Sequence, residues 1–284
     1  MPKYIDIHSH INFKAYDEDR DVVISRALQN DTWIINVGTQ LDTSKKAIEL
    51  AHQFKEGVYA VIGLHPIHTD KSFHDKQELG EEGGEFTSRG EIFDKNIYRE
   101  LLKDKKVVAV GECGLDYYHL DEESIEKQKK AFIEQIELAN EIGKPLMLHI
   151  RNNPKNQNSN AYLDACEILK KFAKVKGVSH FFAGSVEDMK RFIDLGFYIS
   201  FSGPITYKPK PEICDYHKVI LETPIDKILT DTDSPYVAPM PYRGKRNEPF
   251  YVKEIIKKIA EIKGLSEEET AKAIMNNAKN LFDI

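Results

Sequence analysis

The sequence of 284 residues lacks several features that define specialised classes of protein. It has three cysteines, Cys113, Cys166 and Cys214, and they form no CxxC pair. This pattern argues against a disulfide framework and against a zinc site built from thiolates. No low-complexity tract is present, and 41% hydrophobic with 30% charged residues is typical of a globular protein.

Long apolar runs and a strong excess of one charge are also missing. No apolar run approaches the length of a membrane span, and the start MPKYIDIHSH lacks the basic and apolar regions of a secretory signal. We therefore expect a soluble, cytoplasmic protein with no membrane partner. The formal net charge of −6 argues against a protein that coats nucleic acid by bulk electrostatics, although it permits a local basic patch.

Short apolar runs recur along the chain and alternate with segments of helical spacing. Runs such as VYAVIG at 58–63 and VVAVG at 107–111 show no polar alternation, which is typical of parallel strands buried on both faces. We predict eight strands, each followed by a helix, near residues 4–8, 33–38, 58–63, 107–111, 145–149, 177–181, 197–201 and 227–231. Eight such units predict an α/β fold in which residues 1–284 form a single TIM-type (β/α)8 barrel domain.

Two segments depart from this repeat. Ser266 and Glu269 have the spacing of a capping box and begin an additional C-terminal helix that runs to about Leu281. The stretch from about 67 to 94, which contains GEEGGEFTSRG, is polar and is predicted to be an insertion between the third strand and its helix. A connection of this length is either a functional flap or a mobile excursion.

Ionisable side chains stand where the predicted strands end. They are His8, His10, His65, Glu112, His149, His180 and Asp233. The carboxyl ends of barrel strands build the active sites of TIM barrels, so we expect these side chains to converge on one rim. Each has an ordinary structural interpretation by itself, such as a solvated carboxylate or a buried histidine. Their convergence favours a metal site instead, because imidazoles and carboxylates are common metal ligands.

Six of these residues are predicted metal ligands: His8, His10, Glu112, His149, His180 and Asp233. A single tetrahedral ion uses fewer ligands, so the set predicts two divalent ions, with zinc, magnesium or manganese as candidates. Glu112 is the expected bridge because the fourth strand lies midway between the two histidine groups. Two ions lower the pKa of a shared water enough to form hydroxide near neutral pH, which predicts hydrolysis.

Several motifs occur in series over nearly the whole chain. They are YIDIHSHIN, GLHP, GECGLDYY, LMLHIR, HFFAGS, GFYISFSG, TDSPYVAP, YRGKRNEP and NNAKNLF. Together they resemble the TatD family of metal-dependent hydrolases and deoxyribonucleases. This resemblance implies a TIM barrel with a divalent metal centre and a 3′ to 5′ exodeoxyribonuclease or related DNase activity. It places the metal ligands on the same six residues and implies action on DNA, either single-stranded or at 3′ ends. We separately expect a monomer.

The motifs and their positions also predict individual roles. The predicted catalytic residues are Glu112, Asp233, His65 and Asp231, and the predicted substrate-binding residues are Arg151, His65, Tyr236, Arg243 and Lys245. We expect Asp233 to orient the attacking water, and the basic side chains to hold the phosphate and the leaving group. Asp231 stands where the family has glutamate, so its side chain is one methylene shorter.

Two other functions fit parts of this pattern. An enzyme of the amidohydrolase type, acting on an amide, an ester or a small phosphoester, would share the barrel and the metals. Such barrels often bridge their metals with a carboxylated lysine, whereas this chain has Glu112. A metal-binding protein without turnover would keep the ligands and act on no substrate.

Overall fold

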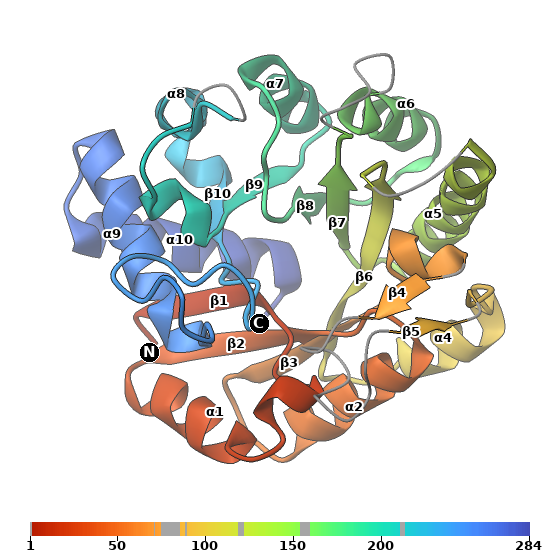
Figure 1. Cartoon of the computed structure of the whole chain (residues 1–284), viewed down its shortest axis with the longest axis horizontal. Coiled ribbons are helices and arrows are strands. Elements are labelled where there is room, and N and C mark those ends of the chain that lie inside the picture. The colour runs from red at the N-terminus through yellow and green to blue at the C-terminus, as the bar shows by residue number, and fades with distance from the viewer. Residues whose placement is uncertain are drawn as a thin grey trace.

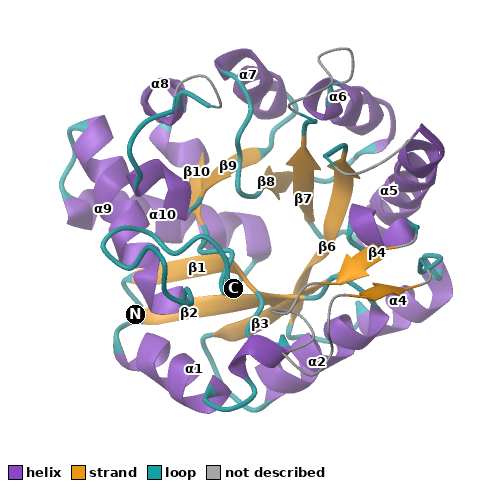
Figure 2. Ribbon diagram, viewed as in Figure 1, coloured by secondary structure: helices purple, strands orange, loops and turns teal. Residues whose placement is uncertain are grey.

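Eight parallel strands surrounded by helices form the main body of the described part of the chain. The computed structural model describes residues 2–70, 72–74, 86–88, 90–118, 122–153, 160–210 and 214–284. The strands form one sheet in the order β1-β2-β3-β6-β7-β8-β9-β10, and the helices form an outer layer (Figure 1). Colouring by secondary structure shows the same two layers (Figure 2). The predicted TIM-type barrel is therefore confirmed.

The strands lie close to the predicted apolar runs. They are β1 (Tyr4–Ser9), β2 (Thr32–Val37), β3 (Val58–Ile62), β6 (Val107–Asp116), β7 (Leu146–Arg151), β8 (Gly177–Ser179), β9 (Tyr198–Phe201) and β10 (Ile228–Thr230). The largest difference is β6, which continues past its predicted end at 111. A charged residue normally marks the end of a buried strand, but Glu112 is buried among histidines, so the strand continues beside β7.

The helices cover the outside of the strands. They are α1 (Arg20–Gln29), α2 (Leu41–His52), α4 (Lys95–Leu101), α5 (Glu122–Ile142), α6 (Ala161–Phe172), α7 (Val186–Asp194), α8 (Tyr216–Glu222), α9 (Val252–Lys263) and the predicted additional helix α10 (Glu267–Phe282). Ser266 forms the predicted capping box, since its hydroxyl accepts from the Glu269 amide at 3.2 Å. In the described part of the chain, no helix is both long and apolar enough to cross a bilayer.

Part of the polar stretch at 67–94 lies outside the described residues, including its GEEGGE portion. Its described parts include a 3-10 turn at Pro66–Thr69 and two short strands, β4 (Ser72–His74) and β5 (Phe86–Ser88). β4 and β5 pair antiparallel in a sheet of their own. They therefore stand apart from the barrel sheet, between β3 and α4, where the insertion was expected.

Residues that follow β10 join it to β1. The Asp233 amide donates to the His8 carbonyl at 3.0 Å, and the His10 amide donates to the Ser234 carbonyl at 2.7 Å. Below them, the buried Asp6 carboxylate accepts from the Thr232 amide at 2.8 Å and from the Thr232 hydroxyl at 2.5 Å. This closure brings Asp233 beside the two histidines of the first strand.

Candidate metal centre

Glu112 lies at the centre of the predicted ligand set. Its Oε2 atom is 3.3 Å from His8 Nε2 and 3.8 Å from His10 Nε2. Its Oε1 atom is 2.6 Å from His180 Nε2 and 2.9 Å from His149 Nδ1. Each carboxylate oxygen therefore faces a different pair of histidines, which is the arrangement expected of a bridging ligand.

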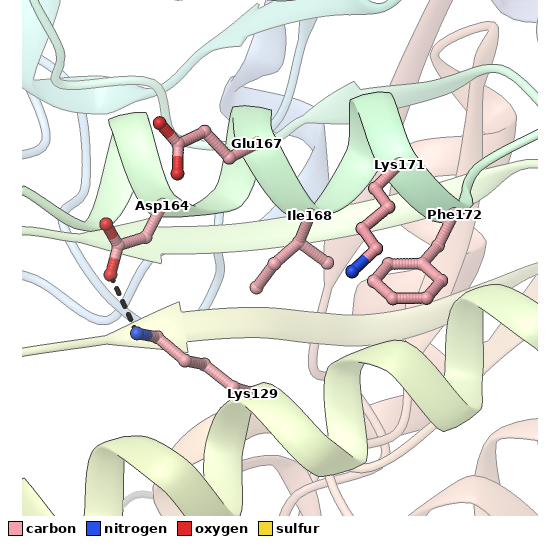
Figure 3. Close-up of a pocket in the computed structure, with 6 residues that line it drawn as sticks. All are labelled: Lys129, Asp164, Glu167, Ile168, Lys171 and Phe172. Carbon is pink, nitrogen blue, oxygen red and sulfur yellow. Dashed lines mark ion pairs between the residues drawn. The ribbon is translucent and has the colours of Figure 1, made fainter.

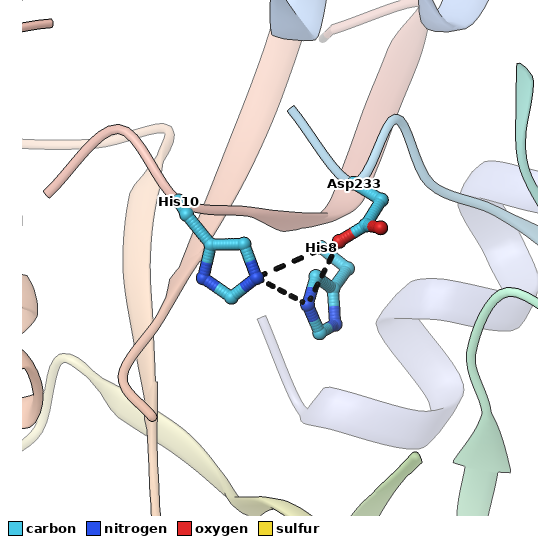
Figure 4. Close-up of side chains that lie close together, drawn as sticks. All are labelled: His8, His10 and Asp233. Carbon is cyan, nitrogen blue, oxygen red and sulfur yellow. Dashed lines mark hydrogen bonds and ion pairs between the residues drawn. The ribbon is translucent and has the colours of Figure 1, made fainter. Parts of the chain in front are cut away.

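His8, His10 and Asp233 form the first group of converging donor atoms (Figure 4). The His8 and His10 Nε2 atoms are 3.1 Å apart, and Asp233 Oδ1 lies 3.7 Å from the first and 3.5 Å from the second. Four ligands about 2.1 Å from a tetrahedral ion are about 3.4 Å from one another. His10 Nδ1 lies 2.9 Å from the Val37 carbonyl, which leaves Nε2 free of hydrogen in the neutral ring. This group therefore fits a divalent cation.

Asp116 supports the second group from outside. That second group of converging donor atoms consists of His65, Glu112 and His149. His149 Nε2 lies 2.8 Å from Asp116 Oδ2, while its Nδ1 faces Glu112. Histidines that bind metals usually donate their other ring N–H to a carboxylate, which fixes the tautomer and the ring orientation. Sequence analysis missed Asp116, although its separation of four residues from Glu112 on one strand places both on the same face.

His65 meets this group as a hydrogen-bond donor. Its Nδ1 atom accepts from the Ile67 amide at 3.2 Å, and burial lowers the pKa of the imidazole to about 4. A neutral imidazole carries a single N–H, so the hydrogen is on Nε2, which lies 3.5 Å from Glu112 Oε1. This tautomer suits donation to a carboxylate or a substrate oxygen better than metal ligation.

Burial and neighbouring charges set the protonation of the centre. Burial raises the pKa of Glu112, but His180 and the other nearby imidazoles outweigh it and hold that pKa well below its usual range. Burial lowers the pKa of His8 to about 3. Burial also lowers the pKa of His149, but Asp116 and Glu112 outweigh it and raise that pKa to about 10. At neutral pH, Glu112 and His8 are thus in the forms that bind metal, whereas His149 must first lose a proton.

Asp231 lies among hydroxyl groups. It accepts hydrogen bonds from the Ser200 and Ser202 hydroxyls and from the Phe181 amide, the last at 3.2 Å. Phe181 has a φ of 42°, in the left-handed region that few residues other than glycine adopt, and it directly follows His180. Asp231 therefore stabilises the turn that carries a predicted ligand, and the two serine hydroxyls satisfy its carboxylate oxygens.

Two glycines let β6 approach β7 closely around Glu112. A Cβ atom on Gly111 would lie 2.5 Å from the Met147 carbonyl oxygen, and one on Gly114 would lie 2.1 Å from the His149 carbonyl oxygen. The register of the two strands shifts between Val110 and Cys113, so Glu112 stands at an irregularity of the ladder. The two glycines of GECG are thus explained by the close approach of the β6 and β7 backbones on either side of Glu112.

The predicted substrate-binding residues lie on the same barrel end. Arg151 is the last residue of β7, and Tyr236 lies in the segment after β10 with its ring centroid 6.4 Å from that of His10. Arg243 and Lys245 are exposed in the same segment. These residues therefore follow strand ends at the mouth of the barrel, and their binding of substrate stays a prediction.

A surface hollow lies away from the barrel mouth, between α5 and α6 (Figure 3). Its lining consists of Lys129, Asp164, Glu167, Ile168, Lys171 and Phe172. Lys129 and Asp164 form an ion pair of 3.1 Å across it, which joins the two helices. None of the predicted ligands lines this hollow, so we assign the chemistry to the barrel mouth.

The fold and the ligand groups define a TIM-barrel metal-dependent hydrolase. The model of the family described as TatD related DNase matches residues 5–283, so the chain belongs to this family. It is 38% identical to the uncharacterized metal-dependent hydrolase YabD of Bacillus subtilis over 98% of both chains. It is 31% identical to the uncharacterized metal-dependent hydrolase YcfH of Escherichia coli, over 99% of this chain and 96% of that one.

A solved structure agrees with this assignment. The crystal structure of YjjV, a TatD homologue from Escherichia coli K12, superimposes with a TM-score of 0.81 and 27% identity, over 99% of this chain and 98% of that one. The family predicted from the motifs is therefore confirmed, and with it the class of metal-dependent hydrolase.

Proposed function

We propose that the protein hydrolyses phosphodiester bonds of DNA, as a 3′ to 5′ exodeoxyribonuclease on single strands or free 3′ ends. The observation that carries this proposal is the placement of Glu112, with one oxygen toward His8 and His10 and the other toward His149 and His180. The description of the matching family as TatD related DNase supports the choice of substrate. All candidate ligands come from one chain, so a monomer is sufficient.

The donor set suits two divalent ions. The ligands would be His8, His10 and Asp233 on one side, His149 and His180 on the other, and Glu112 between them. Mixed imidazole and carboxylate donors suit zinc or manganese, and magnesium is the other candidate. Two such ions supply a nucleophile at neutral pH and neutralise charge on the phosphoryl oxygens.

The side chains of the chain itself supply positioning and proton handling. Burial raises the pKa of Asp233, but the nearby imidazoles of His10, His8 and His180 outweigh it and lower that pKa, so Asp233 is a carboxylate that can orient an attacking water. His65 would donate its Nε2 hydrogen to the phosphate or the leaving oxygen. Arg151 and Arg243, together with Lys245 and Tyr236, would hold the substrate on the rim. Asp231 would act through the turn that carries His180.

A metal-dependent DNA assay tests this function. The protein is stripped with EDTA, reloaded with zinc, manganese or magnesium, and given labelled single-stranded DNA with either a free or a blocked 3′ end. We expect nucleotide release from the free 3′ end, dependent on metal and abolished in Glu112→Gln. Glu134→Gln on the outer helix α5 is the matched control and should keep full activity.

The same preparation distinguishes the competing functions. Hydrolysis of a panel of amides, lactones and small esters without DNA cleavage would establish the amidohydrolase alternative. Metal binding measured by elemental analysis, with no turnover of any substrate, would establish the non-catalytic alternative.

A further inference from the structure

The arginines in the described part of the chain fall into two groups. One group pairs with carboxylates: Arg20 with Asp17, Arg26 with Glu248, Arg99 with Glu141, Arg191 with Asp188 and Arg246 with Asp19. Arg151 and Arg243 form the other group, because no described residue provides either of them with a carboxylate partner. Each stacks on a tyrosine instead: the Arg151 guanidinium carbon is 3.8 Å from the Tyr118 ring centroid, and that of Arg243 is 4.5 Å from the Tyr207 centroid.

Both stacked pairs lie at the barrel mouth, on different sides of the metal centre. Tyr118 follows β6 and Arg151 ends β7, whereas Tyr207 follows β9 and Arg243 follows β10. Stacking restricts a guanidinium group to the ring face and leaves its N–H edge available for a bidentate contact with a phosphate. The two unpaired arginines are therefore prearranged to bind anions at two separate points.

Two segments beside the second pair contain no acidic residue of their own. We call residues 203–210 and 236–245 together the basic sector, and the Tyr207 hydroxyl joins them by donating to the Ala238 carbonyl at 2.7 Å. The sector contains the exposed cations Lys208, Lys210, Arg243 and Lys245 and no aspartate or glutamate. Within the described residues, none of these four cations has an ion pair. A chain with net charge −6 thus concentrates unpaired positive charge beside its metal centre.

We propose that the basic sector and the Arg151–Tyr118 pair bind the backbone of one single strand of nucleic acid on the two sides of the metal centre. This inference rests on the proposed function and adds to it the surface that holds the strand on each side of the metal centre. One phosphate at the metals would not reach two separate arginines and a row of lysines. The aromatic surfaces favour an unpaired strand, since Tyr118 is 38% exposed and rings stack on bases that have left the duplex.

Strand binding without metal tests this surface independently of catalysis. Fluorescence anisotropy measures the affinity for a labelled 15-nucleotide thymidine strand in EDTA at several salt concentrations. The test variant is Lys208→Gln/Lys210→Gln. The control is Lys174→Gln/Lys176→Gln, which removes two exposed lysines with the same spacing before β8, at the opposite end of the barrel.

The expected effect follows from counterion release. Each phosphate contact on a single strand contributes about 0.7 to the slope of log affinity against log salt concentration. Losing two contacts should therefore reduce that slope by about 1.4 and weaken binding about 25-fold at 0.1 M salt. Arg151→Gln and Arg243→Gln should each weaken binding about 5-fold by the same reasoning. The control variant should bind like the unmodified protein.

The outcomes separate this inference from the proposed function. Equal affinities and salt slopes for the two double variants would overturn the inference, even if the enzyme cleaves DNA. A protein that binds the strand through the sector but releases no nucleotide with any metal would support the inference and overturn the proposed function. Absence of any strand binding by the unmodified protein in EDTA would overturn the inference.

Discussion

Replacing Asp116 with asparagine removes the negative charge that faces His149 Nε2 and preserves the size of the side chain. The replaced contact is a 2.8 Å hydrogen bond, and the Asp116 side chain is only 2% exposed. An asparagine can present either its oxygen or its amide group to the ring, so it no longer specifies which imidazole nitrogen carries the hydrogen. His149 would then lose the support that keeps its Nδ1 directed at Glu112.

The expected loss is in metal affinity more than in folding. Changing the carboxylate behind a metal-binding histidine typically weakens metal affinity about 10-fold to 100-fold, or about 1.4 to 2.7 kcal/mol. A buried hydrogen bond to a charged group contributes about 1.5 to 3 kcal/mol, which is of the same size. Burial limits solvent screening here, so we expect an effect near the upper end of the range, about 100-fold.

Competition between the protein and a chromophoric chelator for zinc measures this loss. Asp188→Asn is the matched control, because Asp188 is also a buried carboxylate but binds Ser185 and Arg191 at the start of α7, away from the metal centre. We expect tight zinc binding to persist in the control. Unchanged zinc affinity in Asp116→Asn, with urea unfolding showing a folded protein, would refute the role assigned to Asp116.

Four further results are expected. Glu112→Gln should lose bound metal by elemental analysis along with turnover, and a variant with full activity would contradict the bridge. Gly114→Ala should lower the free energy of unfolding by about 1 to 3 kcal/mol in urea, because its methyl group would meet the His149 carbonyl, and unchanged stability would contradict the close approach. The pKa of His149 is raised to about 10, so protonation of His149 stabilises the metal-free fold fully below pH 6.5 and this stabilisation is lost as the pH rises through 10. Urea unfolding in EDTA should show the loss in the unmodified protein, whereas the His149→Asn variant should not show it. Asp231→Glu should overpack the site beside Ser200 and lower the free energy of unfolding by about 1 to 3 kcal/mol. An equal or higher free energy of unfolding together with faster DNA hydrolysis would show instead that the shorter Asp231 side chain limits the enzyme.

Local patterns in the sequence were sufficient for the barrel and for the ligand types. Apolar runs without alternation predicted strands buried on both faces, and all ten residues of β6 are buried. The HxH spacing of His8 and His10 and the polar residues that end the strands predicted the convergence, because a parallel barrel brings all carboxyl ends to one rim. These inferences need only the chain direction and the two-residue period of a strand.

The tertiary structure decided how the polar groups are paired. Asp6 and Asp116 were missed because the partner of each carboxylate lies on a different segment of the chain. Thr232 binds Asp6 and His149 binds Asp116 only after folding brings those segments together. His65 was placed at the rim by its position, but its tautomer depends on the Ile67 amide and its protonation on burial. Hydrogen-bond partners, burial and the distances between charged groups depend on which strands lie opposite one another across the barrel. Those distances are set only when the barrel has folded and closed.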